Sequence, residues 1–122
     1  MRIQIVHPDP ALEFAFDAED CRILECWNDA DDPQASIARA RVAAGERTRW
    51  HALTGITERY LILTGSGLVE VGENAPKRVG PGDIVVIPAG VRQRISNIGG
   101  GDLLFYAICT PRFRSSAYAA LE

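Results

Sequence analysis

Apolar and polar residues alternate in short runs along most of the chain, and glycine or proline separates many of these runs. This alternation is typical of β-strands, because successive side chains of a strand point to opposite faces of its sheet. The predicted strands cover residues 2–6, 22–27, 36–42, 67–72, 77–79, 84–87 and 103–109, with further strands inside residues 45–65 and 91–97. Many short strands without a long helix predict an all-β fold, and a double-stranded jelly roll fits their number.

Several stretches carry more specific expectations. Residues 84–87 are wholly apolar, which predicts a strand that is buried on both faces. Residues 11–20 are mixed and are expected to form a turn or an irregular segment. Asp9 followed by Pro10 predicts a short helical turn with Asp9 as its N-cap, and residues 115–121 are expected to form one or two helical turns.

The alternation also brings polar residues of different strands to one side. In a closed sheet His51, Glu58 and Gln93 are expected to converge inside the barrel. An imidazole, a carboxylate and an amide oxygen in one enclosed pocket suit a divalent metal. Arg49 shares a face with His51, and Tyr60 shares a face with Glu58.

Two stretches with glycine at fixed spacings resemble the two sequence motifs of the cupin superfamily. They read Gly45-x5-His51-x-Leu53-x4-Glu58-x6-Gly65 and Gly82-x5-Pro88-x-Gly90-x2-Gln93-x3-Asn97, and four of the five defining positions match in each. The resemblance implies a single cupin domain over residues 1–122, folded as a double-stranded β-helix or jelly-roll barrel. The Leu53 and Gln93 positions are usually histidine in the family, so this chain lacks two of the usual metal ligands.

The resemblance also implies a function. A divalent metal, of which iron, manganese, zinc and nickel are the candidates, would be held by His51, Glu58 and Gln93, and would act on a small oxygen-rich molecule in an isomerase, lyase or dioxygenase reaction. His51, Glu58 and Tyr60 are the candidate catalytic residues. Arg49, Tyr60 and Gln93 are the candidate substrate contacts.

Two alternatives do without a metal. The barrel can bind a small ligand, including an anionic one, without catalysis, since both missing ligand positions are histidine in metal-bearing relatives. It can also act as an epimerase-like acid–base enzyme in which His51 works with Glu58 or Tyr60. Structural roles are open as well: Glu58 can pair with Arg49, and Gln93 can orient the His51 ring.

Composition narrows the class of partner. The 122 residues carry a net charge of −3 without a basic cluster, which argues against a nucleic-acid-binding protein. The longest apolar runs are too short to cross a bilayer, and the N-terminus does not resemble a signal peptide, so a cytoplasmic protein with no membrane partner is expected. The three cysteines are expected to be reduced thiols, with Cys109 facing the barrel interior. The resemblance implies a homodimer that binds a small molecule.

Overall fold

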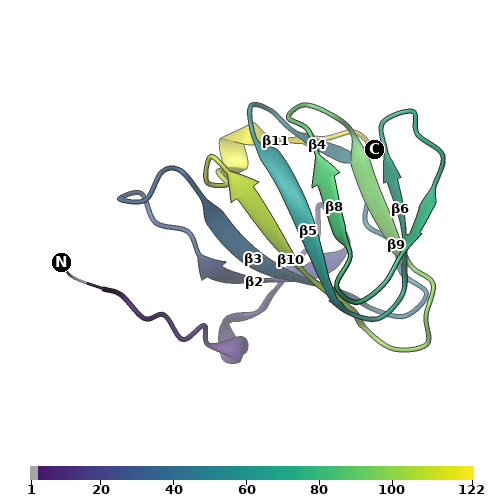
Figure 1. Cartoon of the computed structure of the whole chain (residues 1–122), viewed down its shortest axis with the longest axis horizontal. Helices are drawn as coiled ribbons and strands as arrows, with labels where there is room; N and C mark the ends of the chain where they lie inside the picture. Colours follow the sequence, from purple (N-terminus) through teal and green to yellow (C-terminus); the bar gives the residue numbers. More distant parts are fainter. Residues whose placement is uncertain (1–2) are drawn as a thin grey trace.

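Two antiparallel sheets pack against each other as a jelly-roll barrel (Figure 1), as the strand pattern predicts. The computed structural model describes residues 3–122. One sheet has six strands in the order β1-β2-β3-β10-β5-β8, and the other has five in the order β11-β4-β9-β6-β7. Among the described residues, no helix has the length and apolar composition needed to span a membrane.

The strands are short, and those between residues 21 and 110 follow the predicted spacing. Their bounds are β1 Phe14–Phe16, β2 Cys21–Trp27, β3 Ser36–Val42, β4 His51–Leu53, β5 Thr57–Thr64, β6 Gly67–Val71, β7 Lys77–Val79, β8 Ile84–Ile87, β9 Gln93–Asn97, β10 Leu103–Thr110 and β11 Tyr118–Ala120. Two 3-10 turns, η1 Pro10–Leu12 and η2 Ser115–Ala117, lie near the two ends. The Asp9 carboxylate accepts a hydrogen bond from the Ala11 N–H at 3.0 Å, so the predicted N-cap is confirmed.

The core lies between the two sheets and is built by alternation. Along β10 every second side chain is buried, so that Leu103 and Phe105 point inward. Val42 and Ile62 join them from the same sheet, and Ile95 faces them from the other sheet with no exposed surface. This apolar layer fills one part of the barrel and leaves the remaining interior to polar side chains.

The motif glycines hold turns that other residues would strain. Gly65 has a φ of 93°, and a Cβ added there would lie 2.8 Å from the Asp102 carbonyl oxygen. Gly82 has a φ of 88°, and the Asp83 N–H donates to the Gly80 carbonyl oxygen at 3.0 Å, which confirms the predicted turn. The glycine pattern therefore reflects the backbone of the barrel.

The prediction for residues 84–87 is wrong. Ile84 is 66% exposed and Val86 is 58% exposed, whereas Ile87 is buried. The strand β8 lies at the edge of the six-stranded sheet, where only one face packs against the core. A continuous apolar run does not reveal whether anything covers its second face.

Both ends of the chain also differ from expectation. Residues 3–6 of the expected first strand 2–6 are extended but unpaired, and Arg2 lies outside the described residues; Figure 1 shows this stretch running away from the barrel. The segment expected to be irregular contains β1. Near the C-terminus one 3-10 turn forms as predicted, but β11 then pairs with β4, so residues 103–109 are not in the last strand.

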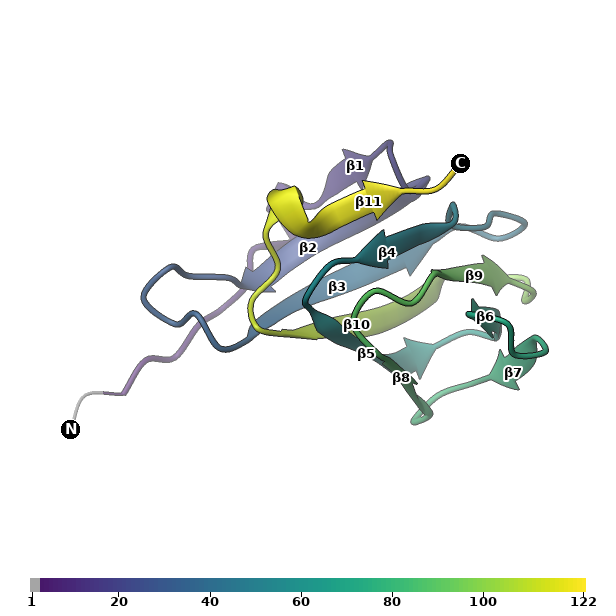
Figure 2. The same cartoon turned by 90° about the horizontal axis from the view of Figure 1, so that it is seen from above.

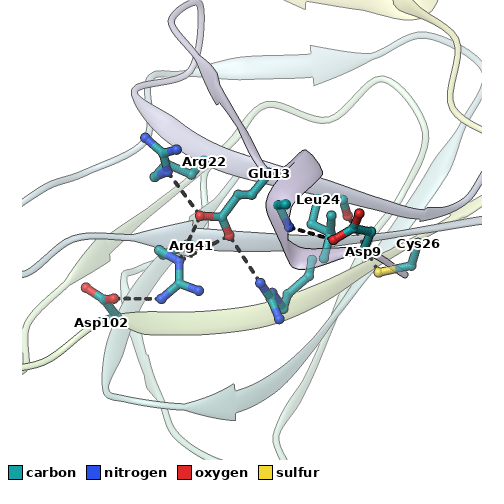
Figure 3. Close-up of polar contacts among 9 residues, drawn as sticks. Asp9, Glu13, Arg22, Leu24, Cys26, Arg41 and Asp102 are labelled. Atoms are coloured by element: carbon teal, nitrogen blue, oxygen red, sulfur yellow. Dashed lines mark hydrogen bonds and ion pairs between the residues drawn. The ribbon is translucent and has the colours of Figure 1, made fainter. Parts of the chain in front are cut away.

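A partly exposed ion-pair cluster fixes the N-terminal segment to the six-stranded sheet (Figure 3). Glu13 contacts Arg22 at 3.0 Å, Arg39 at 3.2 Å and Arg41 at 3.1 Å, and Arg41 also binds Asp102 at 2.8 Å. Burial alone would raise the pKa of Glu13, but the hydrogen bonds from the three arginines outweigh it and lower that pKa. The cluster anchors the chain immediately before β1 and the turn that follows it.

Candidate active site

A cavity of about 330 Å³ lies between the sheets, and residues of β1 and β11 are among those that line it. Figure 2 shows these two strands close together on one side of the barrel. Its walls are mostly apolar and aromatic, with Phe16, Phe113 and Tyr118 among them. Its polar side chains include Glu19, His51, Glu58 and Tyr60. An apolar pocket with a few convergent polar groups is the usual form of a small-molecule site.

Glu19 and His51 form the polar contact that was not anticipated. Glu19 lies in the turn between β1 and β2, and its carbonyl oxygen accepts a hydrogen bond from the Arg49 N–H at 3.2 Å, which ties the turn to the approach to β4. The Glu19 Oε1 atom then lies 3.1 Å from His51 Nε2. His51 Nδ1 lies 2.7 Å from the Arg49 carbonyl oxygen and donates to it. In the neutral ring, Nε2 therefore carries a lone pair.

A hydrogen bond between Glu19 and His51 requires one proton between Oε1 and Nε2. Burial raises the pKa of Glu19 to about 7, against a smaller opposite effect of the Cys21 thiol, which donates to Glu19 Oε2 at 3.2 Å. Burial also lowers the pKa of His51. Both shifts favour a neutral pair, in which the Glu19 carboxyl holds the proton and donates it to Nε2.

A second chain of hydrogen bonds crosses from one sheet to the other. The Gln93 amide, on β9, donates from Nε2 to Glu58 Oε1 at 2.7 Å, and its Oε1 accepts from the Tyr60 hydroxyl. Glu58 and Tyr60 both lie on β5 of the opposite sheet. Gln93 has no exposed surface, so it holds these two residues in fixed positions inside the barrel.

Glu58 is the second carboxyl with a shifted pKa. Burial and the negative charge of Glu19 raise the pKa of Glu58, His51 and Gln93 act in the opposite direction, and the resulting pKa is about 7. Because the two carboxyls repel each other when both are ionised, a state with one proton on the pair is populated around neutral pH. The Oε2 atom of Glu58 has a long contact, 3.9 Å, to the Cys109 thiol.

Tyr118 closes the site from the C-terminal strand β11. Its ring stacks on His51 with centroids 5.3 Å apart and meets Phe16 edge-on at the same centroid distance. Its buried hydroxyl lies near the Glu19 carboxyl, and within residues 3–122 it forms no hydrogen bond of normal geometry. Burial and the nearby Glu19 carboxyl raise the pKa of this hydroxyl, so it remains protonated.

The structure brings some of the predicted residues together and not others. His51, Glu58 and Tyr60 line the cavity, and Gln93 holds the latter two. Arg49 points outward and pairs with Asp20 at 2.7 Å, so neither a contact with the cavity nor a pair with Glu58 is present.

The remaining site expectations concern Leu53, His7 and the thiols. Leu53 lines the cavity, and its apolar side chain offers no metal ligand. His7 lies in the exposed N-terminal stretch. Cys109 faces the interior as expected, and the cysteines are free thiols. Burial raises the pKa of Cys109 and of Cys21, so neither thiol is set up as a nucleophile.

The side chains expected to bind a metal make hydrogen bonds or close polar contacts to other protein groups instead. The Nε2 lone pair of His51 faces Glu19, the Gln93 carbonyl oxygen accepts from Tyr60, and the Gln93 NH2 group faces Glu58. In the part of the chain that the structure describes, no three His, Cys, Asp or Glu side chains are arranged to hold an ion. As arranged here, the set fits proton exchange better than metal coordination.

Sequence reasoning missed Glu19 and Tyr118. The Phe14-Ala15-Phe16 alternation, followed by four residues rich in carboxylates, was a usable signal for a hairpin that carries Glu19. Residues 118–121 show no alternation that distinguishes a strand from a helical turn.

Comparisons with known proteins agree with this architecture. A family model described as a cupin domain matches residues 38–109. No curated protein matches the chain. Among solved structures, KdgF from Halomonas sp. has a TM-score of 0.77 at 16% identity, covering 90% of this chain and 96% of that one. Streptomyces Pac13, a nucleoside dehydratase, has a TM-score of 0.77 at 14% identity, covering 98% and 92%. A predicted oxalate decarboxylase from Thermotoga maritima has a TM-score of 0.72 at 22% identity, covering 87% of this chain and 93% of that one.

Proposed function

The chain belongs to the cupin family, and from this premise we propose that it is a metal-independent enzyme that moves protons on a small carbonyl-containing molecule. The reaction class is isomerisation, or elimination of water, next to a carbonyl group. The observation that carries the proposal is the 3.1 Å contact between Glu19 Oε1 and His51 Nε2, in which a single exchangeable proton is buried beside a ligand-sized cavity.

The second carboxyl supplies the other half of the chemistry. With Oε1 held by Gln93, Glu58 in its ionised form presents Oε2 as a base. Glu58 takes a proton from the carbon next to the substrate carbonyl as that C–H bond breaks. In an elimination the β C–O bond then breaks, and the Glu19–His51 pair gives its proton to the departing hydroxide, which leaves as water. In an isomerisation the same pair protonates a different carbon.

The raised pKa values of the two carboxyls support proton transfer by this pair. An acid and a base are most effective when their pKa values lie near the working pH, and the pKa values of Glu19 and Glu58 are both raised to about 7. Pac13, which shares the fold, is described as a nucleoside dehydratase, so a barrel of this kind carries out the removal of water in another protein.

Metal coordination by His51, Glu58 and Gln93 stays a prediction, and so does pure ligand binding. Both are decided by the experiment that tests the proposal. A metal enzyme would lose activity in excess chelator and recover it with iron, manganese, zinc or nickel. A binding module would retain ligands without converting them.

We expect chelator-treated protein to convert at least one member of a panel of small β-hydroxy carbonyl compounds in deuterated buffer, with loss of water or uptake of solvent deuterium followed by NMR. Glu19→Gln, His51→Gln and Glu58→Gln should each lower the rate roughly 100-fold or more, since each removes a proton-transfer group. His7→Gln is the matched control, because His7 is exposed and lies outside the cavity.

A substrate-independent measurement accompanies the assay. In the nitrogen-15 NMR spectrum of His51, the neutral ring should carry its proton on Nδ1, and Glu19→Gln should change the Nε2 signal. Activity that depends on added metal, or rates in the three variants equal to that of His7→Gln, would contradict the proposal.

A further inference from the structure

The walls of the cavity limit the charge of what it can bind. Among residues 3–122, the cavity is lined by three carboxyl groups, Glu19, Glu25 and Glu58, and by no lysine or arginine. Arg49, the basic residue that the sequence places on the face of His51, is paired with Asp20 on the outside. A carboxylate or phosphate placed in the cavity would lie in an apolar environment without a counter-charge.

The walls also limit the shape of the ligand. Aromatic rings contributed by β1, β10 and β11 and by the segment after β10 surround the space, namely Phe14, Phe16, Phe105, Phe113 and Tyr118. A volume of about 330 Å³ is at the lower end of the range for small-molecule pockets. Such a space suits a single flat ring with a short polar substituent.

One polar group at the reacting end lacks a partner. The Tyr118 ring stacks on His51, and its buried hydroxyl lies near the Glu19 carboxyl without forming a hydrogen bond of normal geometry to any described residue. A buried donor without an acceptor is unfavourable, so a ligand oxygen that accepts from it would bind more tightly for that reason.

We propose that the cavity takes an uncharged, one-ring ligand whose carbonyl oxygen accepts a hydrogen bond from Tyr118, and that it rejects the carboxylate of the same shape. This deepens the proposed function by naming the class of its substrate, and it rests on that function for the reaction only. It differs from the anionic ligand that the sequence alone left open, because the cavity contains carboxyls and no cation.

Benzamide and benzoate test the proposal, because they share shape and size and differ in charge. At about pH 8, where both buried carboxyls are mostly ionised, titration of methyl-labelled full-length protein should show benzamide binding at least about tenfold tighter than benzoate. Signals of Leu53 and Ile23, which line the cavity, should move, and that of the exposed Ile98 should not. Glu58→Gln should narrow the difference by strengthening benzoate binding.

The role of Tyr118 is tested by Tyr118→Phe, which keeps the ring and removes the hydroxyl. We expect a loss of benzamide affinity of about fivefold to tenfold, whereas Tyr106→Phe, a tyrosine that does not line the cavity, should change nothing. Equal binding of the two probes, no binding of benzamide, or an unchanged affinity in Tyr118→Phe would overturn the proposal. So would benzamidine, the cationic isostere, binding more tightly than benzamide at about pH 6, where both carboxyls are mostly protonated.

These outcomes are separate from those of the activity assay. Selective benzamide binding without turnover in the carbonyl panel would retain the ligand class and refute the enzyme. Metal-free turnover with equal binding of benzamide and benzoate would support the enzyme and refute the ligand class.

Discussion

Gln93 shows how one side chain changes what the barrel interior can do. A neutral histidine at this position would offer a ring-nitrogen lone pair to a metal, whereas the Gln93 amide uses its NH2 group and its carbonyl oxygen in two hydrogen bonds. Here it donates to Glu58 and accepts from Tyr60, which joins the two sheets through neutral and charged polar groups. Leu53 removes the other usual ligand and supplies an apolar wall in its place.

Restoring both histidines should therefore restore a metal site. We expect the double variant Leu53→His, Gln93→His to bind manganese or zinc at least about tenfold more tightly than the wild type, because three imidazoles and Glu58 form a familiar donor set. Calorimetry and elemental analysis measure the gain, and Ile98→His, on an exposed loop, is the control. A wild-type protein that already binds stoichiometric metal through Gln93 would contradict the assignment of this amide to hydrogen bonding alone.

At the scale of elements, segments far apart in the sequence assemble the site. The turn between β1 and β2 carries Glu19, β4 carries His51, and β11 carries Tyr118. Figure 2 shows β11 beside β4 and opposite β1, which matches the edge-on contact of Phe16 with Tyr118. The predicted hairpin β6–β7 and the strands β2, β3 and β10 are present within one residue at each end, because their periodicity is local.

The edge strand β8 is where the predicted homodimer can be tested. Its outward residues Ile84 and Val86 are exposed on an unpaired edge, which is a surface that proteins usually cover or charge. If two copies associate there, Val86→Lys should convert a dimer into a monomer in light scattering at micromolar concentration. Ile98→Lys, an exposed isoleucine elsewhere, should leave the mass unchanged. A monomeric wild type, or a dimer that persists in Val86→Lys, would contradict pairing through β8.

At the scale of the whole molecule, the barrel encloses two carboxyls whose titration must affect its stability. The pKa values of Glu19 and Glu58 are raised from 4.5 to about 7 in the folded protein. Between these values the folded state binds more protons than the unfolded state, so the free energy of unfolding falls as pH rises. The pKa of His51 is lowered in the folded protein, so this residue makes the free energy of unfolding fall as pH drops below 6.5. The lowered pKa of Glu13 has the same effect below pH 4.5.

A single variant isolates the contribution of one carboxyl. From pH 5 to pH 8 the wild type should lose roughly 2–3 kcal/mol more of its unfolding free energy than Glu58→Gln does, because the amide has no proton to release. Urea denaturation at several pH values measures this difference. Glu73→Gln, whose side chain is 95% exposed, is the control and should keep the wild-type slope. An identical slope in Glu58→Gln would mean that Glu58 is ionised throughout this range.

The sequence by itself determined the family and the frame of the barrel. Strand periodicity is a property of neighbouring residues, and the motif glycines record turns whose backbone angles exclude other residues, as at Gly65. The same local register placed His51, Glu58 and Tyr60 on inward faces, and all three line the cavity.

The tertiary structure alone decided which partners these residues have. Glu19 reaches His51 from 32 positions away through a hairpin, Tyr118 arrives from the opposite end of the chain, and Arg49 turns outward to Asp20. The tertiary structure also decided that β8 has one uncovered face and that no lysine or arginine among the described residues lines the cavity. Burial, charge pairing and pKa values depend on what surrounds a group in three dimensions. Strand alternation specifies only the face of the sheet to which each side chain points.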